Sequence, residues 1–304
     1  MPISDKVKCL ATFTIDVEDG VSIAMRDAFG KQVPQTERVV TSTNEILDML
    51  GNYEVKATFF VLGKVAEVFP ELVKRIDKEG HEIGIHGYDH FKFYEMNYEK
   101  AKDQLKRAKN VVENLIGAKV LGHRAPAFSI NETTKWALEL LAELDFKYDS
   151  SIMPCMATHY GWPNFTKDIC RINLKNNQSI FEIPMSTITF GKMEIPALGG
   201  SYLRLFPYWF TKYAFRQVQG KRPAIVYMHP YELDTTRYPD YYFEELKKAS
   251  FLKNLKMRSN WFRRSSVKRK LNNLLDQYSF IPMNNLLQQN IEQNEISEVE
   301  LNKN

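Results

Sequence analysis

Two histidines, His86 and His90, are separated by three residues in the segment HGYDH. A spacing of i, i+4 places two imidazoles on one face of a helical turn. From there both rings can present a nitrogen to one divalent cation at about 2.0–2.1 Å. Two partly exposed polar histidines would show the same spacing, so the pair indicates a metal site only together with a carboxylate. Two histidines and one carboxylate leave a position open for water, which is typical of a catalytic metal ion.

Three acidic residues, Asp16, Glu18 and Asp19, stand close together in the segment DVEDG. Like charges at this spacing repel one another, so they need a cation or a shared proton to coexist. One of them can bind the metal ion while another acts as a general base towards metal-bound water, whose pKa falls to about 7. A solvated acidic turn before Gly20 is the alternative interpretation.

His229 ends the apolar segment AIVYMHP, and Arg124 lies in the segment HRAP. A lone histidine after such a strand is more often a satisfied core residue. Next to a metal site it has a chemical role, because amide cleavage needs an acid that protonates the leaving nitrogen. Arg124 can orient the base carboxylate through a bidentate pair, or it forms a purely structural ion pair.

Short apolar segments precede these polar residues along the chain. Their β-branched and aromatic content predicts strands at 10–15, 56–62, 82–85, 120–122, 146–149, 181–183 and 224–228. Helical spacing predicts helices over 72–78, 97–116 and 131–144. The alternation predicts parallel βα units, and about seven of them would close into a barrel. In such a barrel the residues that follow the strands meet at one end.

The chain has 304 residues, of which 44% are apolar and 12% aromatic. This composition is ordinary for a globular enzyme, and a barrel of this length is normally one domain. We expect one domain over residues 1–284, in which 240–284 form a C-terminal helical extension. The polar residues 285–304 are predicted to be a disordered tail. Residues 150–180 and 185–220 are expected to be long loops that cover the site.

The cysteines Cys9, Cys155 and Cys170 form no disulfide framework, which favours buried thiols in a reducing compartment. Residues 1–8 are polar and lack the pattern of a signal peptide. No segment is long and apolar enough to span a bilayer. We therefore expect a cytoplasmic protein.

Charge is unevenly distributed, because residues 247–270 contain ten Lys or Arg and no Asp or Glu within a net charge of +4. Aromatic and aliphatic residues are interspersed among them, so the segment fits peripheral contact with the anionic inner face of a membrane. A solvated helix face is the alternative. No nucleic-acid recognition motif accompanies the charge, and no glycine-rich nucleotide loop follows a strand. Neither nucleic acid nor a nucleotide cofactor is expected as a partner.

Four segments resemble, in order, the motifs of the polysaccharide deacetylases with a NodB homology domain, carbohydrate esterase family 4. The segment TFTIDVEDG resembles the first, acidic motif, and HGYDH resembles the His-x-x-x-His motif. HRAPAF resembles the Arg-x-Pro motif, and IVYMH resembles the closing hydrophobic-His motif. The matches span residues 9 to about 232. The FDVED-type first motif and the YDSS and HYG segments are closer to a branch associated with exopolysaccharide or surface-glycan synthesis.

This resemblance implies a single distorted (β/α)7-type barrel that removes N-acetyl groups from an amino sugar. The substrate would be an N-acetylated polysaccharide, peptidoglycan or lipid-linked glycan precursor. Asp16 takes the place of the general base and His229 that of the general acid. His86 and His90 take the metal-binding places for a divalent ion, with Zn²⁺ expected. Arg124 takes the place that steadies the base.

The sequence departs from the family pattern in two ways. The family's first motif has adjacent aspartates, whereas here two residues separate Asp16 from Asp19. Either Glu18 or Asp19 can therefore be the third metal ligand, and Asp19 is favoured. The acid that tunes the catalytic histidine usually lies near a tryptophan, which is missing here, so Asp149 is the candidate for tuning His229.

Two other functions remain open from the residues. A deformylase or an allantoinase-like amide hydrolase could use the same barrel, and some relatives of that kind act without a metal ion. A catalytically inactive glycan-binding protein is the other alternative, which the complete set of acids and histidines disfavours.

Overall fold

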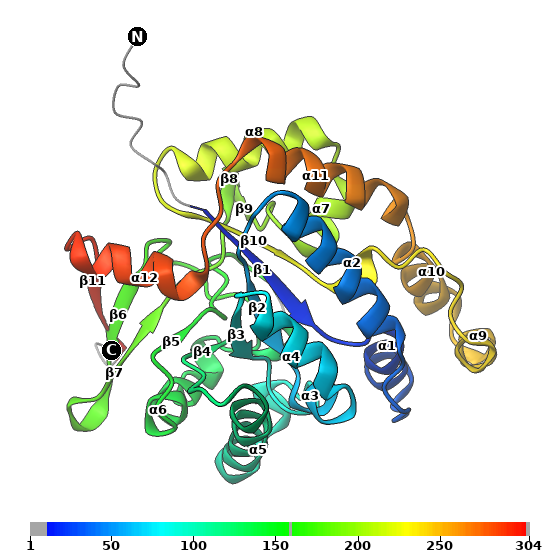
Figure 1. Cartoon of the computed structure of the whole chain (residues 1–304), viewed down its shortest axis with the longest axis horizontal. Helices are drawn as coiled ribbons and strands as arrows, with labels where there is room; N and C mark the ends of the chain where they lie inside the picture. Colours follow the sequence, from blue (N-terminus) through cyan, green and yellow to red (C-terminus); the bar gives the residue numbers. More distant parts are fainter. Residues whose placement is uncertain (1–10, 158–159, 302–304) are drawn as a thin grey trace.

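The fold is built on a curved sheet, seen in a computed structural model that describes residues 11–157 and 160–301 (Figure 1). Cys9 and His159 of the HYG segment lie outside these residues. The sheet has nine strands in the order β10-β1-β2-β3-β4-β5-β7-β6-β11. Its strands are β1 (Ala11–Val17), β2 (Thr58–Val61), β3 (Glu82–Ile85), β4 (Gly122–His123), β5 (Tyr148–Asp149), β6 (Cys170–Asn173), β7 (Ser179–Glu182), β10 (Ala224–Met228) and β11 (Ser297–Glu300). A separate hairpin consists of β8 (Ile188–Phe190) and β9 (Met193–Ile195).

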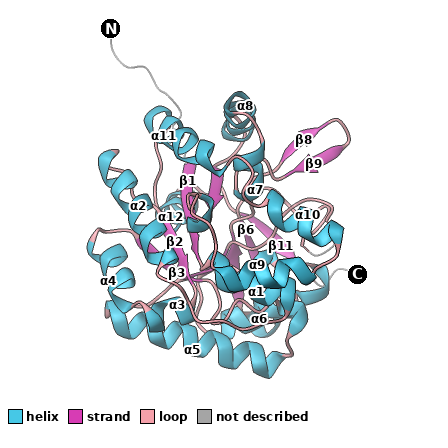
Figure 2. Ribbon diagram, turned by 90° about the vertical axis from the view of Figure 1, so that its right-hand side faces the viewer, coloured by secondary structure: helices cyan, strands magenta, loops and turns pink. Residues whose placement is uncertain are grey.

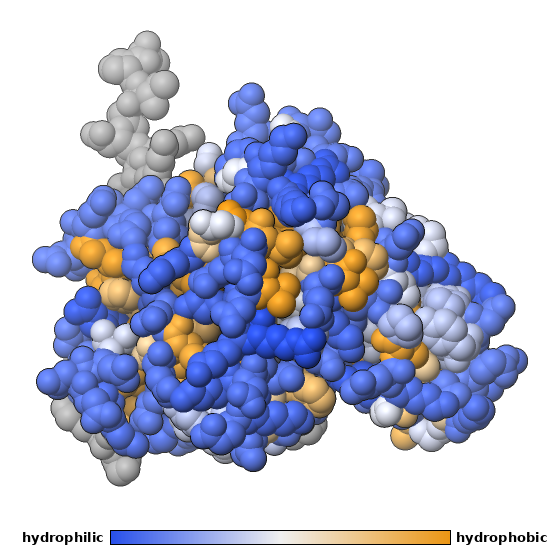
Figure 3. Space-filling view, turned by 60° about the horizontal axis from the view of Figure 1, so that its bottom comes forward, coloured by the Kyte–Doolittle hydropathy of each residue, from blue (hydrophilic) through white to orange (hydrophobic). Residues whose placement is uncertain are grey.

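Helices lie around these strands, as Figure 2 shows. They are α1 (Gly20–Phe29), α2 (Arg38–Asn52), α3 (Gly63–Val68), α4 (Pro70–Lys78), α5 (Tyr98–Ile116), α6 (Trp136–Glu143), α7 (Gly200–Leu205), α8 (Tyr208–Gln219), α9 (Asp240–Lys248), α10 (Phe251–Ser259), α11 (Val267–Gln277) and α12 (Met283–Glu292). Short 3-10 turns include η1 (Phe93–Glu95) and η5 (Pro230–Glu232), the second directly after β10. None of the described helices is both long and apolar enough to cross a bilayer, and the face drawn in Figure 3 is mostly hydrophilic.

The seven strands from β10 to β7 run parallel to one another, as the alternation of strand and helix predicts, whereas β6 pairs antiparallel with β7. Every residue of β1 is buried, because parallel strands between layers of helices have no solvent-exposed face. Within the described residues, no ladder joins β10 to the other end of the sheet. The architecture is therefore that of a distorted (β/α)7 barrel that curves without closing.

Local sequence explains where the predicted helix at 97–116 begins and ends. The side chain of Asn97 accepts from the backbone N–H of Lys100 and so caps α5. Gly117 ends the same helix in the left-handed region at φ 68°. The predicted strands at 82–85 and 224–228 coincide with β3 and β10.

The prediction of a disordered tail is wrong for the described residues up to 301. Leu286 and Leu287 of α12 are fully buried in an apolar cluster that includes Met283 and Ile225. β11 then pairs in parallel with β6 and adds the last strand to the sheet. In Figure 1, α12 and β11 lie beside β6 and β7. Polar composition misled the prediction, because one buried face of three apolar side chains is sufficient to anchor a short helix to a core.

The segments expected to be long loops contain regular structure as well. Residues 150–180 include β6, and 185–220 include the β8–β9 hairpin, α7 and α8. The expected C-terminal helical extension is present as α9, α10 and α11. Cys155 and Cys170 are buried free thiols, as the cysteine content predicts.

Candidate metal centre and active site

Strand register brings the candidate residues to one edge of the sheet. Ile15 of β1 lies opposite Met228 of β10, so the residues that follow, Asp16 and His229, are neighbours across the two strands. On the other side of β1, Val17 pairs with Val61, which pairs with Ile85, which in turn pairs with His123. Because these strands are parallel and in register, the residues after each of them emerge at the same carboxyl end.

Glu18, His86 and His90 form a buried cluster of donor atoms. One oxygen or nitrogen from each residue lies within 4.8 Å of the others. Glu18 Oε2 is 3.4 Å from His86 Nε2 and 2.8 Å from His90 Nε2. The three side chains are at most 7% exposed. Among the described residues this is the group of histidine, cysteine and acidic side chains with the spacing of a metal site.

Hydrogen bonds fix the orientation of both imidazoles. His86 Nδ1–H donates to the carbonyl oxygen of Arg124 over 2.9 Å, so His86 Nε2 carries its lone pair towards Glu18. Glu18 Oε2 itself has no properly oriented hydrogen bond in the described part of the chain. His90 Nδ1 lies 2.8 Å from Arg26 Nη2, which can only donate. With its Nδ1 bonded to the Arg124 carbonyl oxygen, His86 turns Nε2 towards the carboxylate of Glu18.

Electrostatics keep Glu18 ionised. Burial raises the pKa of Glu18, but the neighbouring imidazoles of His90 and His229 lower it well below its ordinary value. Burial likewise lowers the pKa of His90 despite the opposing effect of Glu18, so the ring tends to be neutral. An ionised carboxylate beside two imidazoles is a donor set that can bind zinc.

The structure corrects the preference for Asp19 as the third member of this set. The carboxylate of Asp19 accepts from the backbone N–H groups of Val21 (2.9 Å) and Thr36 (2.5 Å). Asp19 is thus the N-cap of α1 and is turned away from the two imidazoles. Glu18, which the sequence left as the alternative, reaches the histidines instead.

Asp16 and Arg124 form a buried ion pair next to the cluster. Arg124 Nη1 donates to Asp16 Oδ1 over 2.9 Å and to Thr14 Oγ1 over 2.7 Å. Arg124 Nε donates to the carbonyl oxygen of Ser150, and the guanidinium lies 4.3 Å from the centre of the Phe60 ring. Arg124 is fully buried. It is therefore held from several sides and fixes one oxygen of Asp16 in place.

His229 faces the same place from β10. Its Nε2 lies 3.9 Å from Asp16 Oδ2 and 3.7 Å from Glu18 Oε1, and its side chain is 16% exposed. On the other side of the ring, Nδ1 lies 3.6 Å from Glu232 Oε2. Burial lowers the pKa of His229, but Glu18, Glu232 and Asp16 together outweigh it and raise the pKa to about 9. His229 is thus the charged, proton-carrying imidazole of the site.

The structure also corrects the role predicted for Asp149. Asp149 Oδ1 accepts from His123 Nδ1 and from Ser151 Oγ, each over 2.7 Å. The described carboxylates within 4 Å of the His229 ring nitrogens belong to Asp16, Glu18 and Glu232, not to Asp149. The acid next to His229 is therefore Glu232, which sequence analysis missed. Its signal was available as the i, i+3 spacing in HPYE, where the 3-10 turn η5 returns Glu232 to the histidine.

Two protein-family models match this chain. Residues 32–148 match the family model described as polysaccharide deacetylase, and 150–288 match one described as a domain of unknown function (DUF3473). His86, His90 and Arg124 lie in the first region and His229 lies in the second, whereas Asp16 and Glu18 precede both.

Curated relatives match about a third of the chain. A peptidoglycan-N-acetylglucosamine deacetylase of Bacillus cereus is 42% identical over 98 residues, which are 32% of this chain and 36% of that protein. A peptidoglycan deacetylase of Helicobacter pylori is 34% identical over 108 residues, 36% of each chain. The chain thus aligns with about a third of the length of these relatives.

One crystal structure resembles the whole molecule. It is that of a proposed polysaccharide deacetylase from Mycobacterium smegmatis, with a TM-score of 0.63 and 20% identity over 98% of this chain and 95% of that one. This likeness confirms the fold that the sequence resemblance implies. Residues 32–148 thus match the model of a polysaccharide deacetylase domain, and the strand ends of the fold carry the candidate site described above.

Proposed function

We propose that this protein is a metal-dependent N-deacetylase of an N-acetylated glycan. One observation carries the proposal: a buried Glu18–His86–His90 donor set lies beside an Arg124-held Asp16 and a charged His229. The first three side chains can bind a cation, Asp16 and His229 can move protons, and Arg124 holds Asp16 in place. The names of the curated relatives, which are peptidoglycan deacetylases, support the same reaction class.

The donor residues fit a divalent ion, and zinc is the ion we propose. Glu18 Oε2 is buried without a hydrogen bond in the described residues, next to two imidazole nitrogens. A set of one carboxylate and two histidines is three protein ligands, as in catalytic zinc sites. Bound there, zinc would supply Lewis-acid polarisation of the acetyl carbonyl and lower the pKa of water.

The remaining residues perform the proton transfers. Asp16 Oδ2, the oxygen that Arg124 does not hold, takes the proton of the attacking water. Arg124 keeps that carboxylate oriented, because it is a buried, permanently charged partner. His229 enters the reaction protonated and gives its proton to the leaving nitrogen as acetate departs. Glu232 stabilises the charged imidazole from its other side.

Acetate release from a panel of N-acetylated glycans, measured beside the metal content of the same protein, tests this function. We expect release that a chelator abolishes and that added zinc restores. Retained activity without metal, or hydrolysis of formylated but not acetylated substrates, would favour the deformylase or allantoinase-like alternative. Glycan binding in calorimetry without any product would favour the inactive binding protein.

A cytoplasmic location with contact to the inner face of the membrane is a further part of the proposal. On α10, Phe251, Leu252 and Leu255 are 81%, 76% and 58% exposed among basic residues. Such a face can bury its apolar side chains at an anionic surface while each nearby Lys or Arg contributes about 1 kcal/mol. Two of the ten basic residues do not take part, because Arg264 and Lys270 are buried and donate to backbone carbonyls.

Vesicle co-sedimentation at low salt tests the membrane contact. We expect binding to vesicles that contain phosphatidylglycerol and none to pure phosphatidylcholine, with loss of binding as salt increases. The double variant Phe251→Ser and Leu255→Ser should bind less. Phe190→Ser is the matched control, because Phe190 is 54% exposed on the distant β8–β9 hairpin. Equal binding of both variants would contradict the proposal.

A further inference from the structure

A cavity of about 550 Å³ lies beside the candidate active site, between α1, α7, η5 and α10. It adjoins the site at two residues. Tyr231 stacks on the His229 ring at 4.8 Å between centroids and 13° between planes. Glu232, the acid next to His229, also lines the cavity. A substrate that extends beyond the reacting sugar can therefore enter this space without leaving the site.

Two buried arginines line the cavity, and neither has a carboxylate partner within 4 Å in the described part of the chain. Arg204 and Arg264 are each 4% exposed. Arg264 Nε and Nη1 donate to backbone carbonyls, and Arg204 donates through Nη1 to the carbonyl oxygen of Ser259. Carbonyl oxygens satisfy some of the N–H groups but cancel no charge. Glu232 offsets part of the charge of Arg204 without a direct ion pair. Buried cations that lack a direct ion pair are costly, so an anion in the cavity would stabilise them.

The acidic residues of the cavity wall interact mainly with groups other than Arg204 and Arg264. Asp27 pairs with Arg26 at 2.5 Å and with Lys92 at 2.7 Å. Glu232 accepts from the backbone N–H of His229 and faces its ring. Lys253 adds a third cation to the lining. The cavity thus has an excess of positive charge that its own carboxylates do not neutralise.

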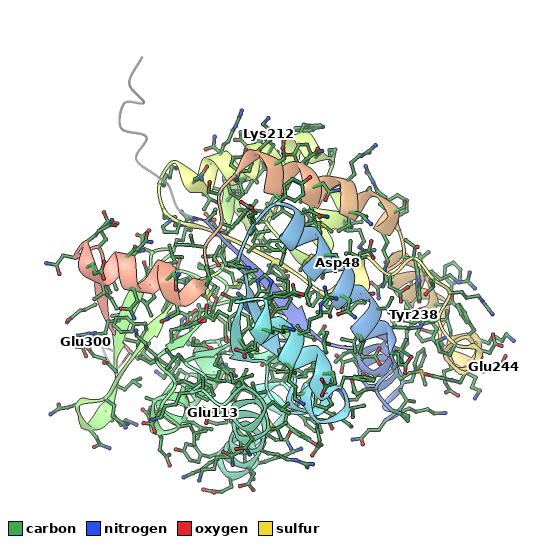
Figure 4. The ribbon with its side chains drawn as sticks, in the orientation of Figure 1. Asp48, Glu113, Lys212, Tyr238, Glu244 and Glu300 are labelled. Carbon is green, nitrogen blue, oxygen red and sulfur yellow. The ribbon has the colours of Figure 1, made fainter. Side chains whose placement is uncertain are left out.

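Aromatic rings form the rest of the wall. Tyr238 lies where α1 meets the C-terminal helices (Figure 4), and its ring contacts Trp261 edge-on at 4.5 Å between centroids. Tyr242 packs against both rings. Arg264 lies 5.1 Å from the centre of the Trp261 ring, which holds the guanidinium in place. Rigid rings next to fixed guanidinium groups form a preorganised surface for a flat, partly apolar ring that carries an oxyanion.

We propose that this cavity binds an acidic sugar residue, one that bears a carboxylate or a phosphate, in the same glycan whose acetylated sugar reaches Asp16 and His229. The inference rests on the proposed deacetylase function and names the substrate class. Arg204 and Arg264 bind the oxyanion, and Tyr238 and Trp261 contact the sugar ring.

Calorimetry with small probes tests the cavity without any turnover. The probes are methyl glucuronide, glucose 1-phosphate, methyl glucoside and inorganic phosphate. We expect at least one of the two acidic sugars to bind at least tenfold more tightly than methyl glucoside and than inorganic phosphate. The tighter of the two identifies the oxyanion as a carboxylate or a phosphate. Equal binding of methyl glucoside, or of free phosphate, overturns the proposal.

Two variants localise the binding. Arg204→Leu removes one cation, and Ala28→Phe places a large side chain in the cavity from α1 while both arginines are retained. We expect each variant to bind the acidic probe at least tenfold more weakly than the wild-type protein does. The second variant decides the result if the first fails to fold. Arg237→Leu is the control, because Arg237 is 69% exposed and lies outside the cavity. Unchanged binding in Ala28→Phe overturns the proposal.

Acetate release separates this inference from the proposed function. We expect wild-type kcat/KM to favour acidic over neutral N-acetylated oligosaccharides, and Arg204→Leu to reduce that preference at least tenfold. Arg237→Leu should keep it. Probe binding without acetate release from any glycan would contradict the deacetylase function but leave the cavity assignment standing. Acetate release without any preference for acidic substrates would do the reverse.

Discussion

Arg124 Nη1 donates to Asp16 Oδ1 over 2.9 Å, and both side chains are almost completely buried. The other oxygen of Asp16 faces His229 Nε2 at 3.9 Å. One half of the carboxylate is therefore fixed by a permanent charge, and the other half remains available for a proton. Arg124 therefore orients the carboxylate, whereas Asp16 and His229 are the residues that can exchange protons.

Replacing Asp16 with Asn should lower turnover by about 10²–10⁴-fold, because the amide cannot accept the proton of the attacking water. Zinc content should stay near wild type, since Glu18, His86 and His90 form the donor cluster without Asp16. Steady-state kinetics and metal analysis of the same preparation check both parts. Activity equal to wild type would remove Asp16 from the mechanism.

Glu18 and Asp19 should respond to substitution in opposite ways. Glu18→Gln should lose most bound zinc, because the carboxylate between the two imidazoles is gone. Asp19→Ala should retain zinc but lower the free energy of unfolding by about 1–2 kcal/mol, since α1 loses its N-cap. Zinc analysis and denaturant unfolding of both variants distinguish the roles. Loss of zinc in Asp19→Ala alone would restore Asp19 as the ligand.

His81 should make the protein less stable in mild acid. Burial and nearby Lys56 lower its pKa to about 4, below the ordinary 6.5. The unfolded chain therefore binds the proton first, so the stabilisation is complete above pH 6.5 and decreases as pH falls towards 4. The loss should be roughly 2–3 kcal/mol.

The matched variant for this effect is His81→Asn. Its side-chain oxygen can replace Nδ1 as acceptor for the backbone N–H of Ala57, but it does not titrate. Urea unfolding of both proteins between pH 7 and pH 4 should show a smaller decrease in the variant. The same slope in both would indicate that His81 already titrates normally.

Leu287→Ala should destabilise the protein by about 2–4 kcal/mol, because the side chain is fully buried under the sheet in α12. Asn285→Ala, an exposed position on the same helix, should change the free energy of unfolding by less than about 0.5 kcal/mol. Thermal or urea unfolding measures both. Similar values for the two variants would mean that α12 does not stabilise the fold.

The sequence alone was sufficient to predict that ionisable residues follow the ends of several strands. Short apolar segments and helical spacing located β3, β10 and α5 closely, and the parallel order followed from the alternation of strands and helices. Since parallel strands deliver their carboxyl ends to one edge, the meeting of Asp16, His86 and His229 was predictable without coordinates.

Only the tertiary structure decided the direction of individual side chains and the packing between segments that are far apart in the sequence. Glu18 and Asp19 are adjacent in the chain, and only the start of α1 and the N–H of Thr36 turn Asp19 away from the histidines. Asp149 bonds to His123 because β4 and β5 pair there, a contact that no local pattern encodes. Likewise, the apolar residues of α12 gain their stabilisation against strands far from them in the sequence, among them β1 and β10. Sequence patterns indicate the local preference for helix, strand or turn. The direction of Asp19, the bond of Asp149 and the packing of α12 depend instead on residues that only the folded chain brings together.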